Sequence, residues 1–168
     1  ENQKNYLNHI PFADHGALLD PPSVDVSARC MGLLAQIGYP KDHPVMKKGL
    51  DFLLHEQEEN GSWFGRWGTN YVYGTWSVLC ALAIAGVATN SAPVRKSVTW
   101  LESKQREDGG WGETGDSYYP ERTEKSFTKL STPSQTAWGV LALLAAGEVN
   151  SEAVRRGVNF LLNAQRCG

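Results

Sequence analysis

The chain has 168 residues, enough for one domain with a substantial core, and this length gives no reason to expect two domains. Its 16 Lys and Arg residues nearly balance 18 Asp and Glu residues, and no basic stripe with interleaved aromatic side chains appears, which argues against a nucleic-acid partner. The longest nearly apolar run, residues 78–88, is too short to span a bilayer, which takes about 20 residues.

Three cysteines, Cys30, Cys80 and Cys167, are scattered along the chain and odd in number. This pattern favours a reducing compartment over a disulfide framework. Cys30 and Cys80 fall in apolar helical stretches, where we expect small buried thiols.

The pattern of apolar residues predicts helical hairpins. In each hairpin, an apolar helix rich in Ala and Leu ends at a glycine (Gly38, Gly86 or Gly147), and an amphipathic helix with basic residues on one face follows. The hairpins are predicted at about 24–58, 72–106 and 133–166, and a polar insert at about 112–131 is predicted to be an irregular loop. We expect the nearly uncharged first helices to be buried on most sides and the second helices to form an outer layer. The fold class is therefore all-α, built from αα-hairpin repeats.

A short pattern of Gln, Gly and Trp, here called the Gln–Gly–Trp device, recurs at the ends of the second helices. Gln57, Gly61 and Trp63 have the same spacing as Gln105, Gly109 and Trp111, and a third copy begins in residues 163–168. A glutamine at a helix end can hydrogen-bond backbone groups of the next hairpin, and an indole can shield those bonds from water. We therefore interpret these residues as a structural connection between repeats.

The segments "KGLDFLLHEQEENGSW" and "KSVTWLESKQREDGGW" resemble the QW repeats of triterpene cyclases. The stretches "IPFADHGALLDPPSVDVSAR", "GSWFGRWGTNYVYGTW" and "STPSQTAWGVLAL" are similar to the C-terminal half of bacterial squalene–hopene cyclases. The resemblance implies part of an (α/α) barrel of the terpenoid cyclase type. It also implies cyclisation of squalene to hopene or hopanol in hopanoid synthesis, without a metal or organic cofactor. For the full-length protein, the resemblance implies a monotopic, homodimeric protein on the cytoplasmic side of the cell membrane.

The acid motif of this family, D-x-D-D, does not occur in the 168 residues. The chain also begins without Met and ends within its third copy of the Gln–Gly–Trp device. We therefore expect a piece of a longer protein in which the acid precedes this chain, and we expect the piece alone to be inactive.

The resemblance assigns supporting roles to Asp25 and Arg29, which would hold and polarise the acidic cluster. Arg29 stands where many members have His, and a permanent cation there would stabilise the deprotonated acid without relaying a proton. The two residues are one helical turn apart, so an ordinary ion pair on the helix surface is the alternative.

Further positions match the substrate cavity of the family. Trp67 would face an early carbocation, and the Tyr73 hydroxyl would help to orient the acid; core packing is the alternative role for both. Phe12 and Ala13 match the constriction between the membrane channel and the cavity, and His15 stands where some relatives have Phe.

Two other functions are consistent with helical hairpins. A zinc prenyltransferase would need Asp, Cys and His arranged as ligands, and no such spacing appears, so no metal site is predicted. A binding or scaffold module without an acid is the non-enzymatic alternative, and the sequence of this chain does not separate it from a cyclase.

Overall fold

The computed structural model describes residues 21–127 and 130–165. Within these residues the long regular elements are six helices, and no strand is present among them. They occur as consecutive pairs: α1 (Val24–Gln36) and α2 (Pro44–His55), α3 (Tyr71–Ile84) and α4 (Ala92–Lys104), and α6 (Pro133–Ala145) and α7 (Glu152–Ala164). The all-α class predicted from the sequence is confirmed.

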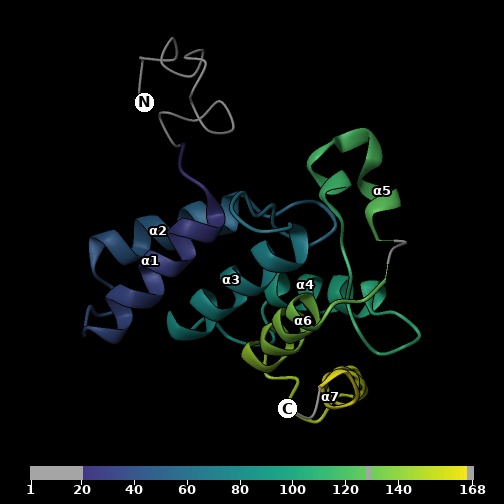
Figure 1. Cartoon of the computed structure of the whole chain (residues 1–168). Coiled ribbons are helices and arrows are strands. Elements are labelled where there is room, and N and C mark those ends of the chain that lie inside the picture. Colours follow the sequence, from purple (N-terminus) through teal and green to yellow (C-terminus); the bar gives the residue numbers. More distant parts are fainter. Residues whose placement is uncertain (1–20, 128–129, 166–168) are drawn as a thin grey trace.

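The helices form two layers. Helix α3 packs between α1 and α6, and these three helices make up the inner layer (Figure 1). In the outer layer, α2 packs on α1, α7 packs on α6, and α4 contacts both α3 and α6. Helix α3 is covered on most sides, as expected. Helix α1 is not, because Val26 and Leu33 are 43% and 58% exposed and no described element covers that side.

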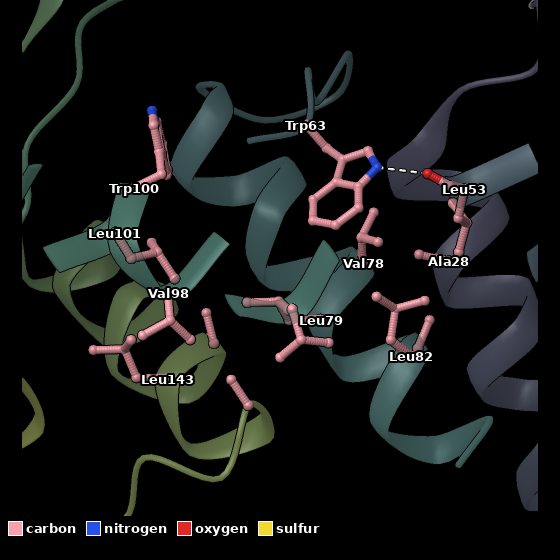
Figure 2. Close-up of a cluster of buried hydrophobic side chains, with 14 of the residues drawn as sticks. Ala28, Leu53, Trp63, Val78, Leu79, Leu82, Val98, Trp100, Leu101 and Leu143 are labelled. Carbon is pink, nitrogen blue, oxygen red and sulfur yellow. Dashed lines mark hydrogen bonds between the residues drawn. The ribbon is translucent and has the colours of Figure 1, made fainter. Parts of the chain in front are cut away.

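The apolar core lies between the layers. The inner helices contribute Val78, Leu79, Leu82 and Leu143, and the outer helices contribute Leu53, Val98 and Leu101 (Figure 2). Each of these side chains is at most 1% exposed. Complete burial of a Val or Leu side chain stabilises a fold by about 1.5–3 kcal/mol, so this contact holds the hairpins together.

The predicted helix ends are largely confirmed. At Gly38, φ is +94°, its N–H donates to Ala35 O, and the N–H of Tyr39 donates to Leu34 O. This pair of bonds is the Schellman arrangement, which needs a left-handed residue that glycine adopts at little cost. The same two-bond pattern recurs at Gly86 and Gly147.

The Gln–Gly–Trp device connects neighbouring hairpins, as predicted. The Gln57 side chain donates to Gly61 O at 3.0 Å and to Pro93 O, in the first turn of α4, at 2.9 Å. The indole N–H of Trp63 donates to Leu53 O in the last turn of α2, so the ring satisfies a helix-end carbonyl (Figure 2).

The second copy of this device repeats the geometry. Gln105 donates to Gly109 O and to Ala153 O of α7, both at 2.8 Å. The Trp111 indole N–H donates to Leu101 O at 2.9 Å. Both tryptophans are 0% exposed, so the structural interpretation of the device is confirmed.

Two further sequence-based expectations are wrong. The insert predicted as an irregular loop contains two 3₁₀ helices, η3 (Gly115–Tyr118) and η4 (Pro120–Arg122), and a one-turn helix, α5 (Thr123–Ser126). Such short helices are stabilised by local caps, here the Thr114 hydroxyl accepting from the Asp116 N–H, and they leave no apolar period in the sequence. Cys30, expected to be buried, is exposed because it lies on the uncovered side of α1.

Candidate active site

A buried carboxylate joins the start of α1 to the loop that precedes α3. Asp25 is 0% exposed and lies in the first turn of α1. Its Oδ1 accepts a hydrogen bond from the Val26 N–H at 3.0 Å, and its Oδ2 accepts one from the Trp67 N–H at 2.8 Å. A negative charge at a helix N-terminus is stabilised by the helix dipole. Asp25 therefore satisfies one backbone N–H in the first turn of α1 and fixes the Trp67 backbone.

Trp67 lines a pocket of about 520 Å³. The side chain is 44% exposed, and the Arg66 guanidinium is 5.6 Å from its ring centroid. The pocket is lined by four aromatic rings, by glycine and threonine, and by one arginine: Phe64, Arg66, Trp67, Gly68, Thr69, Gly115, Tyr118 and Tyr119. Aromatic faces of this kind attract cations by about 0.5–2 kcal/mol each.

The backbone after Trp67 packs directly on Tyr73. A Cβ atom added at Gly68 would lie 2.6 Å from Cγ of the Tyr73 ring, so only glycine permits this approach. Tyr73 itself lies two residues into α3. The loop around Trp67 is thus held by Asp25 on one side and rests on Tyr73 on the other.

Beyond Tyr73, three aromatic rings from α3 and α6 form a cluster. The Tyr73 centroid lies 5.9 Å from that of Trp76 and 5.1 Å from that of Trp138, and the two indoles are stacked at 5.8 Å. The Arg29 guanidinium lies over Trp76 at 4.9 Å and over Tyr73 at 5.6 Å. The cluster therefore already holds one cation against its π-faces.

This position of Arg29 bears on its predicted partnership with Asp25. Asp25 is buried, Arg29 is exposed, and no ion pair joins the two within the part of the chain that the structure describes. The surface ion pair considered as an alternative is therefore absent. Arg29 instead lines a groove of about 240 Å³ between α1 and α3.

Glu113 is a site residue that sequence reasoning missed. It is 6% exposed, and its carboxylate accepts hydrogen bonds from the N–H groups of Asn70, Tyr71 and Val72 at 3.0–3.1 Å. Those amides open α3, so Glu113 caps that helix from more than forty residues away. A sequence feature that could have pointed to Glu113 is a difference between the two copies of the Gln–Gly–Trp device. Residue 113 is Glu, whereas the matching position after the first copy is Gly65.

Gln135, at the start of α6, completes this connection. Its Oε1 accepts from the Glu113 N–H at 2.7 Å, and its amide group donates to Glu113 O at 2.8 Å and to Thr69 O at 3.2 Å. The first turn of α6, the start of the insert and the Trp67 loop are thereby tied together.

The predicted site residues thus fall into three groups. Trp67 lines the pocket, whereas Asp25 and Tyr73 do not line it and instead contact the loop that carries Trp67. Arg29 lies on the far side of Tyr73, in the groove between α1 and α3. Phe12, Ala13 and His15 lie outside the described residues.

The described residues contain neither a membrane-spanning helix nor a metal-binding cluster. None of the helices there has the length and apolarity needed to cross a bilayer. In the same residues, no three His, Cys, Asp or Glu side chains are grouped so that they could hold a metal ion.

The whole chain, residues 1–168, matches the family model described as the squalene-hopene cyclase C-terminal domain. The squalene–hopene cyclase of Zymomonas mobilis is 57% identical over 98% of this chain and 25% of its own length. That of Alicyclobacillus acidocaldarius is 45% identical over 99% of this chain and 26% of its own length. The chain therefore spans about a quarter of the length of the curated relatives it matches.

A solved structure has the same fold. The ent-copalyl diphosphate synthase from Streptomyces platensis superposes with a TM-score of 0.66 at 24% identity, over 89% of this chain and 28% of that chain. This likeness supports a helical-repeat fold of the terpenoid cyclase type, as the sequence predicted.

Proposed function

Because the chain belongs to the squalene–hopene cyclase C-terminal domain family, we propose that it forms one sector of the (α/α) barrel of a squalene cyclase. The hairpins at about 24–58, 72–106 and 133–166 are then successive units of that barrel. The complete protein closes squalene into hopene or hopanol through a series of carbocations.

This chemistry makes three demands on a protein. A strong acid must protonate a terminal alkene, an apolar chamber must fold the chain beforehand, and π-faces must stabilise the cations while water is excluded. The D-x-D-D acid is not part of the 168 residues, so in this proposal the longer protein supplies it. The present chain supplies part of the chamber wall and groups that support the acid.

One observation carries the proposal: Asp25, Trp67 and Tyr73 belong to one contiguous assembly although they come from three elements. Asp25 holds the Trp67 backbone, and Gly68 rests on the Tyr73 ring. A carboxylate, a pocket-lining indole and a phenol are thereby kept in fixed relation. Trp67 is the residue proposed to face an early cation, and Tyr73 is proposed to orient the acid.

Arg29 is proposed to support the acid after it has lost its proton. Its guanidinium stays charged at any physiological pH and so cannot relay a proton. The faces of Trp76 and Tyr73 hold it in place, and a fixed cation lowers the free energy of a nearby carboxylate.

For the complete protein we further propose docking to the cytoplasmic face of the cell membrane and a homodimeric state. Squalene dissolves in the lipid bilayer, so an enzyme that takes it up gains by lying on that surface. The resemblance described above is the support for both points, and no resident metal or organic cofactor is proposed.

The test is incubation of the full-length protein that contains this chain with squalene, followed by gas chromatography and mass spectrometry of the products. Pentacyclic hopene or hopanol is the expected result. If only squalene is recovered from folded protein, the proposal fails and the αα-repeat scaffold becomes the better interpretation.

A further inference from the structure

Tyr118 contacts the Trp67 loop from the insert. It ends the 3₁₀ helix η3, and its ring meets that of Phe64 edge-on, with centroids 5.7 Å apart. Its hydroxyl lies 2.9 Å from Gly68 O and 3.2 Å from Arg66 O. One phenolic proton is thus shared between two carbonyls that are 50 and 52 residues away in the sequence.

The two carbonyls belong to the residues on either side of Trp67, so the Tyr118 hydroxyl holds the backbone on both sides of that residue. The Trp67 N–H is held by Asp25, so each of three successive residues in one loop has a backbone group hydrogen-bonded to a side chain from elsewhere. This stretch lies between the end of α2 and the start of α3 and belongs to no helix. Its position therefore depends on these tethers rather than on a helical hydrogen-bond ladder.

We propose that Tyr118 is a positioning residue for Trp67, which sets the direction of the indole at the pocket and thereby the course of the cyclisation. Only the effect on the course of cyclisation rests on the proposed function. The tether itself follows from the contacts of this chain.

The electrostatic setting of Tyr118 agrees with a donor role. Burial, and secondly the charge of Glu113, raises the pKa of the phenol above its ordinary value. The hydroxyl is therefore protonated throughout the physiological range and keeps the hydrogen that it donates.

Limited digestion with trypsin tests the tether without any need for activity, because trypsin cuts after Arg66, at a carbonyl that Tyr118 holds. The experiment uses the full-length protein under native conditions and follows the new N-terminus at Trp67 by mass spectrometry. Tyr118→Phe keeps the ring and removes the hydroxyl. Loss of one neutral hydrogen bond should speed this cleavage roughly three- to tenfold.

Tyr39→Phe is the matched control, because Tyr39 is 40% exposed against 38% for Tyr118 and lies just past α1, far from the loop in sequence. It should leave the cleavage rate after Arg66 unchanged. Equal cleavage rates in wild type and Tyr118→Phe would overturn the tether.

Product analysis tests the consequence for the reaction. With squalene, Tyr118→Phe should yield a larger fraction of partly cyclised products while the melting temperature stays near that of the wild type. A lower melting temperature with an unchanged product pattern would mean that Tyr118 only braces the fold, and it would overturn the positioning role. If the wild type itself makes no cyclised product, the proposed function fails, and the trypsin result alone then decides whether Tyr118 tethers the loop.

Discussion

The backbone N–H of Trp67 donates a 2.8 Å hydrogen bond to Oδ2 of Asp25, a carboxylate with no exposed surface. The other oxygen of Asp25 accepts from Val26 in the first turn of α1. One side chain therefore fixes both the start of a helix and the loop that presents an indole to the pocket. The coupling joins a position assigned to acid support with a position assigned to substrate contact.

Replacement of Asp25 by Asn should weaken both functions of this side chain. Asn has one acceptor oxygen, so one of the two backbone amides would face an NH₂ group. Loss of a charged hydrogen bond of this kind costs about 1.5–3 kcal/mol in the free energy of unfolding. Urea denaturation measures this loss, and turnover of squalene by the full-length protein should nearly vanish.

Asp51→Asn is the control, because Asp51 is exposed on α2. It should leave stability and turnover unchanged. Near-normal turnover by Asp25→Asn would show that the acid-supporting role is wrong, even if stability fell.

Glu113→Gln tests the long-range cap of α3. The carboxylate accepts three backbone N–H groups, and a neutral amide of the same size has only one acceptor oxygen and no charge for the helix dipole. We expect the free energy of unfolding to fall by about 1–3 kcal/mol. Hydrogen exchange of the Tyr71 and Val72 amides should also become faster. Glu102→Gln, at an exposed position of α4, serves as the control and should change neither quantity.

Substitution by alanine should mainly lower stability at Trp111 and mainly change the reaction products at Trp67. Trp111 is completely buried and donates to Leu101 O, so Trp111→Ala should cost about 3–5 kcal/mol of stability. Trp67 is 44% exposed, and its loss should lower the melting temperature much less while changing the products formed from squalene. A changed product pattern in Trp111→Ala at full stability would contradict the structural interpretation of the Gln–Gly–Trp device.

Alanine substitutions at Gly38 and Gly109 distinguish the cost of a left-handed backbone from the cost of a steric clash. Gly38 has φ of +94° with open space around it, so Gly38→Ala should cost about 1–2 kcal/mol from the left-handed backbone alone. Gly109 has φ of +87°, and an added Cβ would lie 2.6 Å from Arg156 O. Gly109→Ala should therefore be clearly the more destabilising of the two in thermal unfolding. Equal losses would mean that the turn can move away from α7.

Regular, local features were predictable from the sequence. The helices and their glycine ends follow from apolar spacing and from the Schellman geometry, which a few adjacent residues determine. The connection made by Gln57 and Gln105 was predictable because the repeat displays the same device twice. A pattern that occurs twice indicates a structural contact even when its distant partner atoms are not known from the sequence.

Contacts specific to one place were not predictable. Glu113 caps α3 only because the insert begins beside it. The difference from Gly65 marks residue 113 as unusual, but it does not indicate that the helix starting at residue 71 is the partner. Arg29 lies on aromatic rings of a neighbouring helix rather than beside Asp25, since helix packing and not sequence distance decides its partner. Exposure of Cys30 likewise depends on which sides of α1 have neighbours.

The glutamine connections also impose an order of events while the chain is being made. The side chain of Gln57 bonds a carbonyl 36 residues further on, and that of Gln105 bonds one 48 residues further on. A ribosome adding about 5–20 residues per second needs on the order of seconds to deliver each acceptor. The first two hairpins therefore emerge before the acceptors of Gln57 and Gln105 exist, with Trp63 and Trp111 incompletely covered. The nascent chain stays dependent on the next unit until that unit has been synthesised.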